Sequence, residues 1–151
     1  MAPFETRSYL DDFLRAVRRL DVHAVSRLSA AVFEAWRHGR TVFVCGNGGS
    51  ACSASHLATD LSKLTGAASR PVKRLKAVAL TESASALTAI GNDIAFEEVF
   101  AEQLRTFLQP GDVLIALSTS GASPNVLRAV EHANEHGGLT LAVTGRNGQP
   151  L

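Results

Sequence analysis

The chain has 151 residues, of which 46% are hydrophobic and 19% charged, and its formal net charge is +1 at pH 7. This length suits one domain with a buried core, and the composition excludes a disordered or fibrous chain. The sequence contains no dense run of lysine or arginine, so we expect no direct binding to nucleic acid. It also lacks the ~20 consecutive apolar residues of a membrane-spanning helix and the pattern of a signal peptide. We therefore expect a cytoplasmic protein without membrane contact, in which Cys45 and Cys52 stay reduced.

Two amphipathic helices are predicted at the N-terminus. Apolar side chains recur at intervals of three and four in residues 5–20 and again in residues 22–39, where Asp21 can cap the helix. One helix can cover a sheet of the same chain, and the other can pack against a second subunit. The pattern alone leaves that oligomer open.

Strands and helices alternate after residue 40. The predicted strands cover 41–45, 77–81, 113–117 and 139–144, and the predicted helices cover 51–64, 83–90, 94–108 and 123–136. Continuously apolar strands separated by helices indicate a parallel sheet that is covered on both faces. We predict an α/β protein with a three-layer, doubly wound parallel sheet. It forms a single domain of residues 1–151, with helices in 1–39 and the α/β core in 40–151.

Small polar residues follow two of these strands, at 46–50 and at 118–123, and each group precedes a helix. Ligands of such sheets bind at the carboxyl ends of the strands. Hydroxyls, backbone N–H groups and the positive end of a helix dipole together suit a phosphate. The sequence therefore predicts an anion site in which Ser118, Thr119, Ser120 and Ser123 take part.

Other groups near this edge have competing interpretations. His56 and Asp60 lie four residues apart on one helix face, where they could bind a metal, move protons or simply bond to each other. Asn92 and Asp93 could reach the same edge or only form a turn. Residues 46–51 also fit a dinucleotide fingerprint, but Glu82, the nearest candidate for holding a ribose, lies far along the chain.

The remaining charged side chains of the later helices are expected at the surface. We interpret Glu97, Glu98 and Glu102 as a solvated helix face, opposite an apolar stripe that runs from Phe96 to Phe107. His132 and His136 are interpreted as surface residues or as partners of the dipole at the C-terminal end of the last helix.

With these residues in view, the chain resembles the sugar isomerase (SIS) domain family and, within it, the phosphoheptose isomerases. The matching stretches are residues 45–51, 86–93, 96–100, 110–115, 118–121 and 123–126. The resemblance implies a flavodoxin-like fold, a homotetramer in which the N-terminal helices pack, and isomerisation of sedoheptulose 7-phosphate to a heptose 7-phosphate. It also implies a further C-terminal strand and helix that residues 40–151 do not include.

The resemblance further implies roles for individual residues. The phosphate would be held by the loop of residues 118–123. The substrate would also be contacted by Asn47, Gly48, Gly49, Ser50, Asn92 and Asp93. His56 and Asp60 would perform the proton transfer and would meet zinc where it is bound. Asp60 stands where the family has glutamate, which withdraws the carboxylate by about 1.5 Å, roughly one C–C bond. A non-catalytic SIS module that binds a phosphosugar or a replication-initiator protein remains the alternative.

Overall fold

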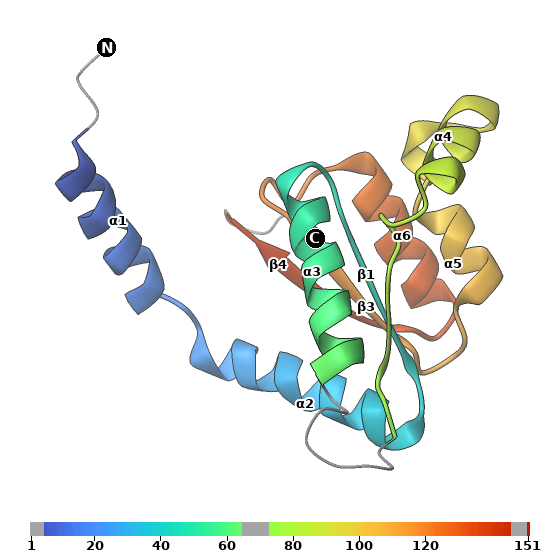
Figure 1. Ribbon diagram of the computed structural model, residues 1–151, viewed down its shortest axis with the longest axis horizontal. Coiled ribbons are helices and arrows are strands. Elements are labelled where there is room, and N and C mark those ends of the chain that lie inside the picture. Colours follow the sequence, from blue (N-terminus) through green and yellow to red (C-terminus); the bar gives the residue numbers. More distant parts are fainter. Residues whose placement is uncertain (1–4, 65–72, 146–150) are drawn as a thin grey trace. The chain divides into compact units, whose positions relative to one another are not determined.

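The computed structural model describes residues 5–64, 73–145 and 151 (Figure 1). The chain divides into two compact units, Met1–Ala30 and Ala31–Leu151. The first unit holds α1 (Thr6–Arg18), none of whose residues is buried, and the beginning of α2 (Val22–His38). Oδ1 of Asp21 accepts the backbone N–H groups of His23 and Ala24 at 2.9 and 3.1 Å, so Asp21 caps α2 as predicted.

The second unit is built on one parallel sheet, which confirms the predicted fold class. Its strands are β1 (Thr41–Gly46), β2 (Lys76–Ala79), β3 (Val113–Ser118) and β4 (Leu139–Thr144), in the order β2-β1-β3-β4. Gly46 of β1 pairs with Leu117 of β3. The two central strands therefore end side by side, and the loops that follow them meet at one edge of the sheet.

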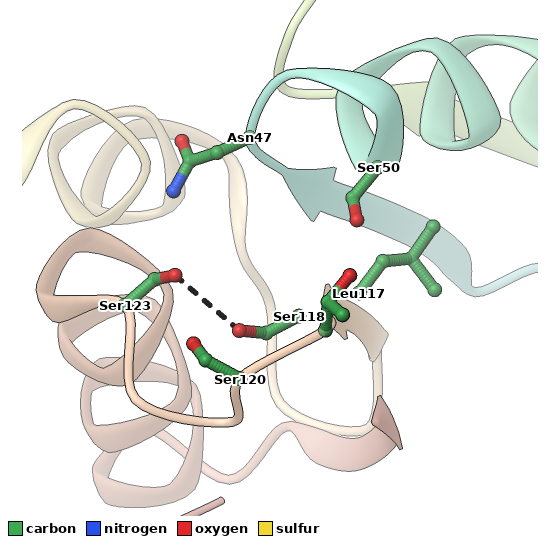
Figure 2. Close-up of a pocket in the computed structure, with 7 residues that line it drawn as sticks. Asn47, Ser50, Leu117, Ser118, Ser120 and Ser123 are labelled. Atoms are coloured by element: carbon green, nitrogen blue, oxygen red, sulfur yellow. Dashed lines mark hydrogen bonds between the residues drawn. The ribbon is translucent and has the colours of Figure 1, made fainter. Parts of the chain in front are cut away.

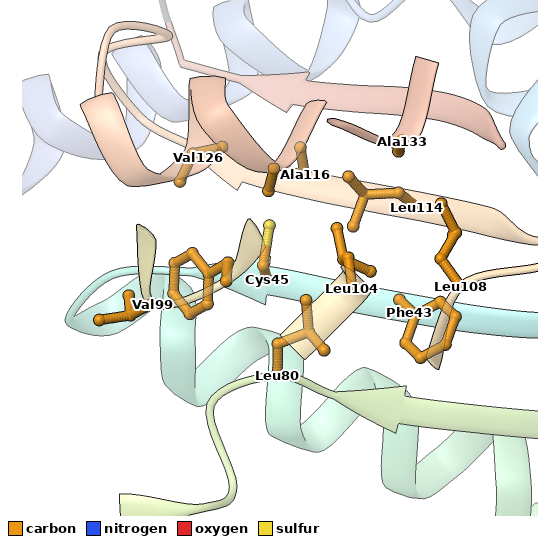
Figure 3. Packing of buried hydrophobic residues seen from close by; sticks show 12 residues of the cluster. Phe43, Cys45, Leu80, Val99, Leu104, Leu108, Leu114, Ala116, Val126 and Ala133 are labelled. Carbon is orange, nitrogen blue, oxygen red and sulfur yellow. The ribbon is translucent and has the colours of Figure 1, made fainter. Parts of the chain in front are cut away.

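Helices cover both faces of the sheet because the strand side chains alternate between them. Val42 and Val44 pack on α3 (Gly49–Leu64) and the end of α2. Phe43 and Cys45 point to the other face, toward α5 (Ala101–Phe107) and α6 (Pro124–Glu135), where Figure 3 shows the packing. Burial raises the pKa of the Cys45 thiol to about 12, so this side chain serves as an apolar core residue, as its place in the strand predicts.

Three elements predicted between residues 77 and 108 have other boundaries in the structure. The second strand ends at Ala79 instead of residue 81, because Thr81 turns away and its hydroxyl lies 3.1 Å from that of Ser55. The predicted helix 94–108 is interrupted. Helix α4 (Ala84–Asp93) runs through the expected turn at 91–93, and extended backbone at Ala95 (φ −169°) separates it from the 3₁₀ turn η1 (Phe96–Glu98) and from α5.

Three expectations about single side chains in this region were also wrong. Phe96, which follows the break at Ala95, and Phe107, the last residue of α5, lie outside the core, with 62% and 58% of each exposed. The side chain of Glu98 is only 13% exposed, and its carboxylate forms ion pairs with Arg105 at 3.1 Å and Arg128 at 3.0 Å. Glu98 therefore belongs to an ion-pair network and not to a solvated helix face. His132 is only 9% exposed because its side of α6 faces the sheet.

Within the described parts of the chain, none of the helices combines the length and apolar character that crossing a bilayer requires.

Candidate functional site

A cavity of about 290 Å³ opens at the carboxyl ends of β1 and β3. The residues that line it are Asn47, Ser50, Leu117, Ser118, Thr119, Ser120 and Ser123. Figure 2 shows side-chain oxygens of Ser50, Ser118, Ser120 and Ser123 around one space. None of the described lining residues carries a charge. The volume is at the low end for small-molecule sites, about 300 Å³, and suits a compact polar group.

The loop after β3 is held in place by its own hydroxyls. Oγ of Ser118 accepts the N–H of Gly121 at 3.1 Å and lies 3.3 Å from Oγ of Ser123 (Figure 2), while Oγ of Ser120 accepts the N–H of Ala122 at 3.2 Å. Gly121 supplies the positive φ of 71° that this tight turn requires. The loop ends at Ser123, where α6 begins, so the positive end of the helix dipole lies at the cavity.

The loop after β1 approaches this first loop closely. A Cβ atom on Gly46 would lie 2.8 Å from Cβ of Ser50 and 2.9 Å from the carbonyl oxygen of Leu117, so only glycine fits there. Gly48 has φ 53°, and the carbonyl of Asn47 accepts the N–H of Ser50 at 2.9 Å. This turn places Asn47 and Ser50 in the cavity wall, while Gly48 and Gly49 shape the turn without lining the cavity.

The side chains of Asn47 and Asn125 join the two loops. Nδ2 of Asn47 donates to Oδ1 of Asn125 at 2.8 Å, and Nδ2 of Asn125 donates to Oδ1 of Asn47 at 2.9 Å. Asn125 is 2% exposed and was not among the predicted site residues. Two signals in the sequence point to it: its place at the start of a helix directly after a serine-rich loop, and the family resemblance of residues 123–126.

The structure does not bring the remaining predicted residues into the cavity wall. His56 and Asp60 lie on α3, with Nε2 and Oδ2 3.3 Å apart and with 79% and 47% of their side chains exposed. Asn92 donates to Oδ1 of Asp93 at 2.7 Å at the exposed end of α4. The predicted anion loop and the Asn47–Ser50 loop are thus together, whereas these two pairs are set apart from them.

The profile of the SIS domain family matches residues 7–145. The chain belongs to the SIS domain family. Its relatives in this family include the phosphoheptose isomerase of Chlorobaculum parvum, 44% identical over 133 residues, and that of Nitratiruptor sp., 47% identical over 120 residues. These alignments cover 87% and 80% of this chain, and the chain spans 63% of the length of each relative.

A solved structure agrees with this assignment. The phosphoheptose isomerase GmhA of Neisseria gonorrhoeae superimposes with a TM-score of 0.85 at 36% identity, and the match covers 95% of this chain and 74% of that one. Glu82, the candidate for holding a ribose in the dinucleotide interpretation, lies three residues beyond Ala79, the end of β2, and does not line the cavity.

This SIS domain presents two neighbouring donors where zinc is predicted. An imidazole and a carboxylate 3.3 Å apart, as at His56 and Asp60, can serve as two ligands of one zinc ion. In the described ranges no group of three or more histidine, cysteine or acidic side chains could hold a metal. His56 and Asp60 therefore fit as two members of a zinc ligand set, and any further histidine, cysteine or acidic ligand would have to come from outside the described residues.

Proposed function

We propose that this chain is an aldose–ketose isomerase that converts sedoheptulose 7-phosphate to D-glycero-D-manno-heptose 7-phosphate. The observation that carries the proposal is the cavity lined by hydroxyls at the N-terminus of α6. Hydroxyl groups, backbone N–H groups and a helix dipole stabilise a phosphate without a paired cation. Relatives named as phosphoheptose isomerases favour this substrate over other sugar phosphates.

The place of the His56–Asp60 pair outside the cavity wall fits a sugar phosphate that extends beyond its phosphate group. The reacting carbons C1 and C2 lie at the opposite end of the substrate from the phosphate, roughly 8 Å away by ordinary bond lengths. His56 follows Ser50 by six residues on α3, a rise of about 9 Å along the helix axis. Acid–base groups for C1 and C2 are therefore expected outside the phosphate pocket, about one sugar length away.

The proposed chemistry moves one proton between neighbouring carbons. Asp60 removes a proton from C1 of the ketose, which gives an enediol, and the proton returns to C2 while another moves from O1 to O2. His56, at hydrogen-bond range of Asp60, orients this carboxylate and can serve the oxygens. We propose zinc as a partner of the same two side chains, where it would act as a Lewis acid on the sugar oxygens.

We also propose that the active protein is a homotetramer of the cytoplasm. Helix α1 exposes Leu10, Phe13, Leu14 and Val17, each to 46–55%, an apolar stripe that a second subunit would cover.

The direct test is an activity assay on the purified full-length protein. Sedoheptulose 7-phosphate is added with and without zinc, and formation of the aldose is followed over time, with an Asp60→Asn variant as the matched control. The proposal predicts turnover that the variant lacks. Absence of turnover in both conditions would refute the isomerase.

The second candidate is a non-catalytic SIS module that binds a phosphosugar or a protein such as a replication initiator. The exposure of His56 and Asp60, 79% and 47%, favours it, because acid–base groups usually act where water is excluded. Tight binding of sedoheptulose 7-phosphate without turnover would support this module over the enzyme.

A further inference from the structure

Asn125 is the second residue of α6, and it is almost completely buried, with 2% exposed. It does not line the cavity, but its amide forms two reciprocal hydrogen bonds with that of Asn47, which does. The two residues are 78 positions apart in the sequence. Asn125 thus bonds the start of α6, which follows the serine loop (residues 118–123), to the glycine loop (residues 46–50).

Two simultaneous hydrogen bonds fix more than one bond could. A side-chain amide has two N–H donors and a carbonyl oxygen with two lone pairs. The pair occupies one donor and one lone pair on each residue, so an N–H and a lone pair of Asn47 stay available. Because Asn47 is exposed and belongs to the cavity wall, those two groups can reach a ligand.

The surroundings of Asn125 make it the fixed member of the pair. Pro124 precedes it at the first position of α6, where the ring restricts the backbone, and Val126 follows it with 0% exposed. Asn47, in contrast, lies on a turn next to Gly48 and Gly49. Without its partner, the Asn47 amide could rotate, and donor and acceptor would exchange places.

We infer that Asn125 is a positioning residue that holds the amide of Asn47 in the orientation that contacts the sugar part of the substrate. The inference rests on the proposed function, in which the serine loop holds the phosphate and Asn47 a sugar hydroxyl. The affinity for a sugar phosphate and the affinity for inorganic phosphate should therefore respond differently to changes at Asn125. Loss of Asn125 affects binding of a sugar phosphate and leaves binding of inorganic phosphate unchanged.

The test is a double-mutant cycle measured by calorimetric titration of the full chain with sedoheptulose 7-phosphate and with inorganic phosphate. The variants are Asn125→Ala, Asn47→Ala and the double variant, and Asn125→Leu retains the packed volume should the alanine variant fail to fold. The control is Asn134→Ala on the same helix, whose Oδ1 accepts from Thr140 at 2.8 Å, away from the cavity. Amide hydrogen exchange of residues 47–50 is measured without ligand in every variant.

Each single change should weaken the binding of sedoheptulose 7-phosphate by about three- to tenfold, which corresponds to the loss of one neutral hydrogen bond. The double variant should lose no more than either single one, since both changes remove the same contact. Exchange at 47–50 should rise in Asn125→Ala and not in Asn134→Ala. Equal losses for the two ligands, additive losses, or unchanged exchange would each overturn the inference. A wild-type chain that binds no sedoheptulose 7-phosphate would refute the proposed function, and the exchange measurement alone would then decide about Asn125.

Discussion

Replacing Ser118 by alanine tests the phosphate site at its most enclosed hydroxyl. Ser118 is 5% exposed, it lines the cavity, and its oxygen accepts the N–H of Gly121 at 3.1 Å. The hydroxyl thus both shapes the loop and is available to a ligand. Alanine removes both contributions without adding volume.

The size of the effect follows from these contacts. A hydrogen bond to a charged group contributes about 1.5–3 kcal/mol, so the dissociation constant of sedoheptulose 7-phosphate should rise by about 10- to 100-fold. The N–H of Gly121 keeps its second bond, to the carbonyl oxygen of Ser118 at 3.2 Å, so the free energy of unfolding should fall only by the worth of one neutral hydrogen bond, about 0.5–1.5 kcal/mol.

Calorimetric titration and thermal unfolding of Ser118→Ala measure the two effects separately. The matched control is Ser62→Ala, which removes a part-buried hydroxyl that donates to Ala58 on α3 at 2.8 Å and does not line the cavity. Affinity that is unchanged in a folded Ser118→Ala protein would show that the assigned loop does not bind the phosphate.

Three further predictions concern other parts of the chain. Asp60→Glu should raise the rate of isomerisation if reach limits the carboxylate, up to about 100-fold for a correction near 1 Å, as measured by kcat. Gly46→Ala should lower both thermal stability and ligand affinity, because its Cβ would lie 2.8 Å from Ser50. The pKa of His132 is lowered, chiefly by burial and further by the charges of His136 and Arg105, so the folded state favours the neutral imidazole. The free energy of unfolding should therefore be fully retained above about pH 6.5 and decline as the pH falls through the lower folded-state pKa, a dependence that His132→Gln removes.

Each of these has an outcome that contradicts it. An Asp60→Glu enzyme slower than the wild type would show that the site is built for the shorter side chain. A Gly46→Ala protein of wild-type stability would mean that the two loops can separate freely. For His132, a pH dependence between 5 and 7 that persists in the glutamine variant would assign it to other groups.

The strands and the anion loop could be predicted because their signals are local. Short apolar runs such as Val113–Ala116 are typical of strands that are buried on both faces of a parallel sheet. Hydroxyl residues directly after such a strand lie at its carboxyl end. Gly46 indicates a close approach of another segment after β1, although only the structure shows that this neighbour is Leu117 of β3.

The parts that could not be predicted depend on tertiary contacts. The spacing of apolar residues over 94–108 fits one helix, and the extended Ala95 that interrupts it has no local marker. Glu98 is drawn into an ion-pair network by Arg128, 30 residues away. The same holds for Asn125, whose partner lies in another loop.

A crystal structure of the chain with sedoheptulose 7-phosphate would test the central claim most directly. The account predicts the phosphoryl group among the hydroxyls of Ser118, Ser120 and Ser123, with C1 and C2 directed toward His56 and Asp60. A sugar phosphate bound elsewhere, or one whose carbonyl end points away from that pair, would contradict it.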